Sequence, residues 1–245
     1  MSGRRGTSAA DGFFVRSAAL IGADALSRLA CARVLVVGVG GVGSWCAEAL
    51  VRTGLGAVAL MDDDLVAASN VNRQCPATSL TVGASKVEAM KERLLAINPE
   101  CRVDAAGARF EDFSSVGAMG EFDLVVDAID SVPCKAELIL GATERGIPIV
   151  SSMGAALRTD PTKVCVRRFD KVEGDGLARA LRQRFKRLGR FPAAPFRCVC
   201  STEPPAALPP GAEKGSLMTV TATFGMCLAA EALKILGAEG GLNLV

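Results

Sequence analysis

Short apolar runs, separated by stretches with helical spacing, make up the first 150 residues of the chain. The runs that predict strands occupy residues 34–37, 57–61, 102–106, 124–128 and 148–150. Apolar residues three and four positions apart predict helices, which occupy 43–52, 85–97 and 133–145. Because strands that alternate with helices form parallel sheets covered on both faces, we predict an α/β fold with a Rossmann-like, doubly wound, mostly parallel sheet.

The two ends of the chain depart from this alternation. Residues 16–30 predict one amphipathic helix or two short ones ahead of the first strand. The pattern is weaker after residue 150. It predicts an edge strand at 163–168 and a helix at 177–188. A loop rich in proline and glycine follows at 189–215, and an apolar helix at 218–236. We therefore expect a disordered tail over 1–12 and a single domain over 13–245. Its C-terminal part is a helical and loop extension with a basic, substrate-binding insertion at about 158–215.

Composition limits the class of protein. Half of the 245 residues are hydrophobic, which is enough for one sizeable core. The net charge of +2 indicates by itself neither a nucleic-acid nor a membrane partner. The nine cysteines are scattered and none forms a C-x-x-C pair, as is typical of a reduced, cytoplasmic compartment. We find no apolar run that predicts a transmembrane segment, and MSGRRGTSAADG lacks the apolar core of a signal peptide.

The absence of two residue types excludes several kinds of chemistry. The chain contains no histidine and no tyrosine. Ser-His-Asp and Cys-His catalysis are therefore excluded within it, as is any zinc site that needs histidine. Catalysis must come from carboxylates, Lys and Arg, Cys, Ser and Thr, main-chain groups or a bound metal.

A glycine-rich turn follows the first predicted strand. Gly38, Gly40 and Gly43 fit the pattern G-x-G-x-x-G between a strand and a helix, where the backbone can approach an anion and helix N–H groups can bind it. Asp62 lies about 20 residues further on, at the end of the second strand, where an acid can hold ribose hydroxyls. Up to this point NAD and ATP fit equally well, and a purely structural turn remains open.

The residues after Asp62 favour ATP. SNVNRQ and VGASK place Asn70, Asn72, Arg73 and Lys86 where they can converge on one anion at the carboxyl edge of the sheet. Such a cationic clamp suits a triphosphate whose developing charge must be stabilised. DLVVDAIDS adds Asp127 and Asp130, either of which could hold Mg²⁺. Taken singly, these residues could be solvated surface charges or a helix cap.

The order of these motifs carries a family resemblance. GVGGVGS, MDDD, SNVNRQ, VGASK and DAIDS together resemble the ubiquitin-activating-enzyme-like adenylating family, which includes the ThiF-type activators of sulfur carriers. The resemblance implies a homodimer in which ATP and Mg²⁺ bind and a substrate carboxylate attacks the α-phosphate. Arg73, Lys86 and Asp130 would carry that chemistry, with the metal on Asp130. The implied ATP-binding residues are Gly38, Gly40, Gly41, Gly43, Asp62, Asp64, Asn70, Arg73, Gln74, Lys86, Asp130 and Ser131.

One family feature is altered. Members often begin with Arg-aromatic-x-Arg, whose first arginine reaches into the partner subunit's site. Here the stretch is FFVRS, so Phe13 replaces that arginine and Arg16 matches the second one. The resemblance thus leaves open whether Arg16 supplies a trans-acting cation.

Other motifs resemble one branch of that family. VRTGLG, INPECRV, DAIDSV, RCVCSTE and SLMTVTATFG resemble the branch that dehydrates the threonylcarbamoyl group on adenosine 37 of tRNA. In that reaction the carbamoyl nitrogen closes onto the adenylated carboxylate and expels AMP. Two alternatives remain: an activator of a sulfur carrier ending in Gly-Gly, for which the zinc-binding C-x-x-C pairs are missing, and a non-catalytic nucleotide-binding module. Neither the use of a sulfur-relay partner nor the tRNA specificity follows from the sequence.

A basic segment fits a tRNA substrate. Between residues 158 and 197, Lys and Arg number twelve against four Asp and Glu. Helical spacing over 177–188 turns four cations to one side, namely Arg179, Arg182, Lys186 and Arg190. Such a stripe can bind a phosphate backbone, although an ordinary solvated helix face has the same pattern.

Three cysteines and one acid have individual expectations. Cys198 lies in the predicted flexible loop and could act as a nucleophile that takes the acyl group from AMP. Cyclisation needs no thioester, because the attacking nitrogen is already tethered to the carbonyl. Cys46 and Cys227 have apolar neighbours and are expected to pack in the core. Glu203 could position the substrate.

Overall fold

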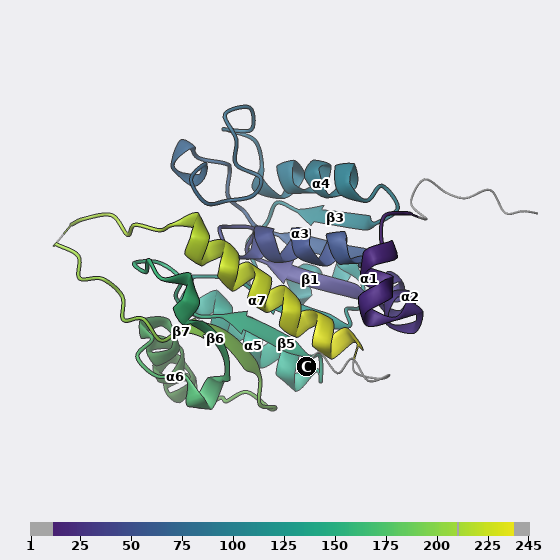
Figure 1. The fold of residues 1–245 in the computed structure, drawn as a ribbon. Helices are drawn as coiled ribbons and strands as arrows, with labels where there is room; N and C mark the ends of the chain where they lie inside the picture. Colours follow the sequence, from purple (N-terminus) through teal and green to yellow (C-terminus); the bar gives the residue numbers. More distant parts are fainter. Residues whose placement is uncertain (1–11, 210, 238–245) are drawn as a thin grey trace, which may run out of the picture.

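A computed structural model describes residues 12–209 and 211–237 of the chain. Its strands form one seven-stranded sheet in the order β3-β2-β1-β4-β5-β7-β6 (Figure 1). Neighbouring strands are parallel except β6, which runs antiparallel to β7. The strands are β1 Arg33–Val37, β2 Ala57–Met61, β3 Arg102–Ala106, β4 Leu124–Asp127, β5 Ile149–Ser152, β6 Val164–Arg168 and β7 Arg197–Ser201. The doubly wound, mostly parallel sheet predicted from the sequence is confirmed.

Helices cover both faces of the sheet. The helices are α1 Val15–Ile21, α2 Ala23–Cys31, α3 Gly43–Thr53, α4 Lys86–Ile97, α5 Val132–Glu144, α6 Gly176–Leu188 and α7 Met218–Gly237. Alternate side chains of β1 belong to two different hydrophobic clusters, one on each face of the sheet, because side chains alternate between the faces along a strand. Val34 and Val36 pack with α3, α4 and α7, whereas Leu35 and Val37 pack with α5 and α6. Figure 1 shows α3 and α7 side by side on one face.

The order in which the chain adds strands to the sheet reverses beside β1. The chain builds β1, β2 and β3 outward to one edge and then returns to place β4 and β5 on the other side of β1. At such a switch point the loops that follow the two central strands diverge and leave a crevice at the carboxyl ends of the strands. The glycine-rich turn after β1 and the DAIDS segment after β4 both open into this crevice.

Two local predictions need correction. The loop expected over 189–215 contains strand β7, which lies between β5 and β6 and is therefore defined by long-range pairing rather than by a local pattern. The segment 16–30 forms two helices, because Gly22 has φ +84° and interrupts the helical backbone between α1 and α2. The expected tail over 1–12 lies, apart from Gly12, outside the described residues.

Helix α7 is long and apolar. With 20 residues and a mean hydropathy of 1.4, it meets the length and composition of a membrane span, which the sequence reading did not anticipate. Half of its most apolar window is buried inside the fold. Val220, Phe224 and Leu228 belong to the core that α3 shares, and a core helix of this kind passes the same test.

Candidate active site

A cleft of about 1050 Å³ opens at the carboxyl ends of β1, β2, β4 and β5. It has the size of a nucleotide or drug-sized ligand site. All but one of the predicted ATP-binding residues line it, namely Gly38, Gly40, Gly41, Asp62, Asp64, Asn70, Arg73, Gln74, Lys86, Asp130 and Ser131. Parts of the chain that are distant in sequence therefore meet in one cavity.

The glycine turn leaves backbone donors free at the start of α3. The N–H groups of Gly40, Gly41 and Val42 make no hydrogen bond to any described residue, and all three residues line the cleft. Gly43 has a different role from the expected one. A Cβ on Gly43 would lie 1.9 Å from the carbonyl oxygen of Gly38, so this glycine allows close backbone packing instead of facing the cavity. Free N–H groups at a helix start favour an anion.

Asp62, at the end of β2, braces this turn. One carboxylate oxygen accepts a hydrogen bond from the N–H of Val39 at 2.7 Å, and the other accepts one from the N–H of Asp64 at 3.0 Å. Lys86, the first residue of α4, is buried, and its Nζ lies 2.5 Å from Asp64 Oδ2 and 3.7 Å from Asp62 Oδ1. Two carboxylates therefore fix a lysine ammonium at the side of the cleft.

The SNVNRQ segment turns back on itself beside the cleft. Arg73 Nη1 donates to the carbonyl oxygen of Ser69 at 2.8 Å and to Asn72 Oδ1 at 3.0 Å. Asn70 Oδ1 accepts from the N–H of Ala67 at 3.0 Å and so closes the turn. Asn72, which the sequence placed with the anion-binding residues, does not line the cleft and instead donates to the carbonyl oxygen of Ser216 at 3.0 Å.

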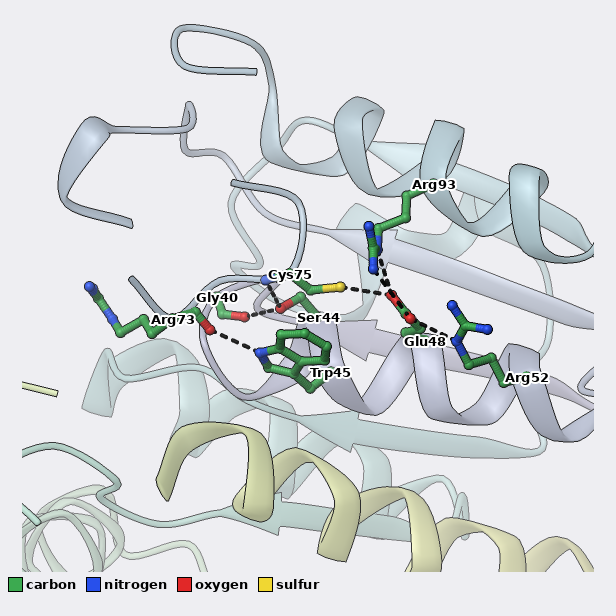
Figure 2. Close-up of polar contacts among 8 residues, drawn as sticks. All are labelled: Gly40, Ser44, Trp45, Glu48, Arg52, Arg73, Cys75 and Arg93. Atoms are coloured by element: carbon green, nitrogen blue, oxygen red, sulfur yellow. Dashed lines mark hydrogen bonds and ion pairs between the residues drawn. The ribbon is translucent and has the colours of Figure 1, made fainter. Parts of the chain in front are cut away.

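Helix α3 holds the backbone of this segment. Figure 2 shows the indole of Trp45 donating to the carbonyl oxygen of Arg73, at 2.9 Å, while the Arg73 side chain points away from the helix. The hydroxyl of Ser44 donates to Gly40 at 2.6 Å and accepts from the N–H of Cys75 at 3.1 Å. The glycine turn and the arginine segment are thus tied to the same helix.

A buried acid on α3 completes that connection. Glu48 accepts from Cys75 Sγ at 2.8 Å, from Arg93 Nε at 2.6 Å and from Arg52 Nε at 2.7 Å (Figure 2). Burial favours the neutral acid, but these hydrogen bonds outweigh it and lower the pKa of Glu48 to about 2. Burial and the Glu48 carboxylate raise the pKa of the Cys75 thiol to about 12. Sequence reasoning missed this cluster, because its members lie on three separate segments.

The two acids of DAIDS have opposite environments. Asp127 is fully buried and lies 2.8 Å from the equally buried Nζ of Lys135, so it cannot reach a ligand. Asp130 is exposed, lines the cleft and makes no hydrogen bond or ion pair to any described residue. Asp130 is therefore the acid of this pair that can offer oxygen to a cation. Arg109, which was not predicted from the sequence, also lines the cleft and donates to Ser131 Oγ at 3.3 Å.

The opposite end of the cleft is built by the segment after β5 and the start of α6. Arg158 and Asp175 are both buried there, with Arg158 Nη2 3.2 Å from Asp175 Oδ2. Leu157 has φ +64°, the one positive value among the described non-glycine residues. Its N–H donates to the carbonyl oxygen of Gly215, and its carbonyl oxygen accepts from the N–H of Ala206. Glu203 accepts from the N–H groups of Thr159 and Asp160, which lowers its pKa. It therefore shapes the wall of the cleft without lining it.

The basic stripe is smaller than predicted. Arg179 and Lys186 are exposed on α6, and neither makes an ion pair with an acid among the described residues. Arg182 instead donates to the carbonyl oxygens of Phe169 and Val172 at 2.7 and 2.6 Å, and it lies over the Phe169 ring. Arg190 lies beyond the end of α6 and pairs with Glu137 and Glu144. Two of the four cations are thus held by the fold.

Cys198 is not in a flexible loop. It lies in β7 and is buried, and burial raises the pKa of its thiol well above the ordinary value. Cys46 is also buried and Cys227 half-buried, in agreement with their expected packing role. Phe13 and Arg16 are exposed at the start of α1 and do not line the cleft. A thiolate is disfavoured at Cys198, and no residue of β7, Cys198 included, lines the cleft.

The cleft as a whole suits a polyanionic ligand. It combines the free backbone donors of the glycine turn with the cationic side chains of Arg73, Lys86 and Arg109. The carboxylates of Asp63 and Asp130 also line it, and neither makes a hydrogen bond or ion pair to a described residue. This set can bind a nucleotide triphosphate and neutralise charge on a leaving pyrophosphate. The cleft continues from the glycine turn to the segment after β5 and the start of α6.

Comparisons with known proteins agree with this geometry. A family model described as the ThiF family matches residues 14–244. A tRNA threonylcarbamoyladenosine dehydratase from Escherichia coli (strain K12) is 38% identical over 256 residues, covering 90% of this chain and 92% of that protein. The protein of the same name from Bacillus subtilis (strain 168) is 41% identical over 181 residues, covering 72% and 70%.

Solved structures give the same likeness. Crystal structures of E. coli tRNA N6-threonylcarbamoyladenosine dehydratase in complex with AMP and with ATP match with TM-scores of 0.88 and 0.86. Their sequence identities are 40% and 41%, and both matches cover 95% of this chain and 97% of that one. The similarity therefore extends over nearly the whole fold and includes the region of the cleft.

Proposed function

The chain belongs to the ThiF family, and from this we propose that it is an ATP-dependent dehydratase of threonylcarbamoyladenosine at position 37 of tRNA. One observation carries the proposal: all but one of the predicted ATP-binding residues line one cleft in a chain that matches the ATP complex of such a dehydratase over 95% of its length. The AMP complex of the same relative fits a reaction in which AMP is released.

In the first step, the threonyl carboxylate attacks the α-phosphorus of ATP. The new oxygen–phosphorus bond forms as the bond to the pyrophosphate oxygen breaks, which gives an acyl-adenylate and pyrophosphate. Arg73 and Lys86 orient the triphosphate and stabilise the charge that develops on the leaving group. The free N–H groups of Gly40 to Val42 bind phosphate oxygens, and Asp62 holds the ribose.

The residues present fit Mg²⁺. Asp130 is a free carboxylate on the cleft wall, and a hard divalent cation prefers carboxylate and phosphate oxygens. When bound, Mg²⁺ supplies positive charge to the triphosphate. Asp130 would hold it, and the neighbouring Ser131 and Asp64 would border the same phosphates.

In the second step, the carbamoyl nitrogen attacks the activated carbonyl carbon. A carbon–nitrogen bond forms, the bond to AMP breaks, and the nitrogen loses its proton, so that the nucleoside has lost one water overall. The nitrogen and the carbonyl belong to one molecule, and this tethering makes ring closure fast without an enzyme nucleophile. We therefore assign no covalent step to Cys198.

The tRNA would approach over α6. The N-terminal end of α6 lines the cleft through Gly176, Leu177 and Ala180. Arg179 and Lys186 lie on the exposed side of the same helix. A phosphate backbone that leaves the cleft along this helix meets these cations in turn. Arg182 and Arg190 keep a supporting role, because their guanidinium groups are already bound.

We further propose a cytoplasmic homodimer, in agreement with nine free cysteines and with exposed apolar side chains such as Leu80 beside the arginine segment. No feature of residues 12–209 and 211–237 favours a sulfur-relay partner. The alternative function, activation of a Gly-Gly sulfur carrier, is less well supported. A sulfur carrier protein adenylyltransferase from Thermus thermophilus is 34% identical over 88% of this chain, whereas the two dehydratases are 38% and 41% identical.

The decisive experiment is nucleoside mass spectrometry. tRNA bearing threonylcarbamoyladenosine is incubated with the protein and Mg²⁺, with and without ATP. We expect the nucleoside to lose one water only with ATP present. An unchanged nucleoside, together with pyrophosphate exchange that depends on a Gly-Gly carrier, would replace the proposal by the alternative.

A further inference from the structure

A fully buried ion pair lies directly beneath the turn that carries Asp130. Asp127 ends β4, and Lys135 lies in the first turn of α5; neither side chain is exposed at all. Lys135 Nζ lies 2.8 Å from Asp127 Oδ2, and the same oxygen accepts a hydrogen bond from the Ser151 hydroxyl of β5 at 2.6 Å. The pair thus joins two strands and a helix behind the cleft wall.

Stability does not explain this pair. Two charges taken out of water cost several kcal/mol each, and an apolar pair of similar volume is often as stable or more so. A lysine in the first turn of a helix is also opposed by the helix dipole. A feature that is expensive in the core points to a geometric task.

That task is visible at Ile129. Its N–H donates to Asp127 Oδ1 at 3.2 Å, and its carbonyl oxygen accepts from Lys135 Nζ at 2.9 Å. Both polar groups of the residue before Asp130 are therefore bound by the two members of the pair. On the other side, the N–H of Ala128 bonds the carbonyl oxygen of Val37, which joins the turn to the strand before the glycine loop.

Asp130 itself depends on this backbone. Its carboxylate has no hydrogen bond or ion pair among the described residues, so the main chain decides from which point of the cleft wall this side chain starts. We propose that Asp127 and Lys135 are positioning residues, which fix the Ile129 backbone so that the Asp130 carboxylate faces the metal-bound triphosphate. This inference rests on the metal-binding role of Asp130 in the proposed function.

The test measures Mg²⁺-dependent ATP binding, without tRNA and without turnover, by calorimetry over a series of Mg²⁺ concentrations. The main variant replaces the cluster by apolar side chains, Asp127→Val with Lys135→Met and Ser151→Ala, so that no charge is left unpaired. We expect it to fold and to need at least tenfold more Mg²⁺ for half-maximal ATP affinity. Its ATP affinity without Mg²⁺ should stay within twofold of the parent protein.

A milder variant protects the test from misfolding. Ser151→Ala leaves the ion pair in place and removes one hydrogen bond to Asp127; we expect a two- to threefold shift in the Mg²⁺ requirement. Glu231→Gln is the matched control, because Glu231 is a buried acid with two cationic partners, Arg197 and Lys234, and does not line the cleft. It should not shift the Mg²⁺ requirement.

Asp130→Asn distinguishes a failure of the metal-binding role of Asp130 from a failure of the positioning role of Asp127 and Lys135. If it leaves the Mg²⁺ requirement unchanged, the metal-binding role in the proposed function fails. If it raises that requirement while the folded apolar variant and Ser151→Ala both match the parent protein, the positioning role is overturned. Should the apolar variant not fold, Ser151→Ala alone decides in the same way.

Discussion

The indole N–H of Trp45 donates a hydrogen bond to the backbone carbonyl oxygen of Arg73 at 2.9 Å. A side chain of helix α3 thereby fixes the position of the Arg73 backbone relative to the glycine turn at the start of the same helix. The phosphate clamp is consequently held by one rigid element, and catalytic groups on a rigid support need less reorganisation when the ligand binds.

Replacing Trp45 by Phe tests this support. The variant keeps the aromatic packing and loses one hydrogen bond, which contributes about 1 kcal/mol. We expect the KM for ATP to rise about fivefold, with a fall of about 2 to 4 °C in Tm. Steady-state assays of AMP release with tRNA at saturation measure the effect. An unchanged KM would show that Arg73 is held without Trp45.

Lys86 is expected to act on the transition state. Lys86→Ala removes a buried cation beside the phosphates and leaves Asp62 and Asp64 without it, so we expect kcat to fall by about 100- to 1000-fold. Lys91→Ala, on the same helix but outside the cleft, is the control and should keep its activity. Full ATP-dependent turnover by Lys86→Ala would remove this residue from the mechanism.

Cys198→Ala should keep ATP-dependent dehydration within about threefold. Its thiol is buried and its pKa is raised well above the ordinary value, so little thiolate exists at neutral pH. The measurement is the rate of water loss from the tRNA nucleoside. A loss of 100-fold or more in a variant with an unchanged circular-dichroism spectrum would instead indicate a thioester intermediate.

Salt dependence can separate free from bound cations on the basic segment. Each phosphate contact contributes about one unit to the slope of log K against log salt. We expect Arg179→Ala and Lys186→Ala each to reduce that slope by about one unit in tRNA binding. Arg190→Ala should change it little, because Arg190 is paired with Glu137 and Glu144. Equal slopes in all three variants would contradict the proposal that the tRNA binds along α6.

The low pKa of Glu48 predicts an acid transition. A carboxyl whose pKa falls from 4.5 to about 2 on folding stabilises the protein above pH 4.5, and this stability is lost as the pH falls toward 2. We expect the free energy of unfolding of the parent protein to drop by about 2 to 3 kcal/mol more than that of Glu48→Gln over this range. Urea titrations at several pH values measure it, and parallel curves would contradict the prediction.

Much of the fold and of the cleft was determined by local sequence. The alternation of apolar runs with helical spacing defined five strands and their helices, and the strand order of a doubly wound sheet then placed the segments after β1, β2 and β4 at one edge. Gly40, Asp62 and Lys86 could be assigned to one site for that reason alone: each directly follows or ends such a strand, or begins the next helix.

Other features depended on tertiary structure. Strand β7 exists because β5 and β6 pair with both of its edges, and this pairing buries Cys198 in a segment that reads as a loop. Asp127 and Asp130 have the same chemistry and lie three residues apart, yet β4 buries one and the turn exposes the other. Arg179 on α6 has no ion-pair partner among the described residues, whereas Arg190, beyond the end of that helix, pairs with two acids of α5. Period and motif describe neighbours along the chain, whereas burial and ion pairing depend on residues that only folding brings together.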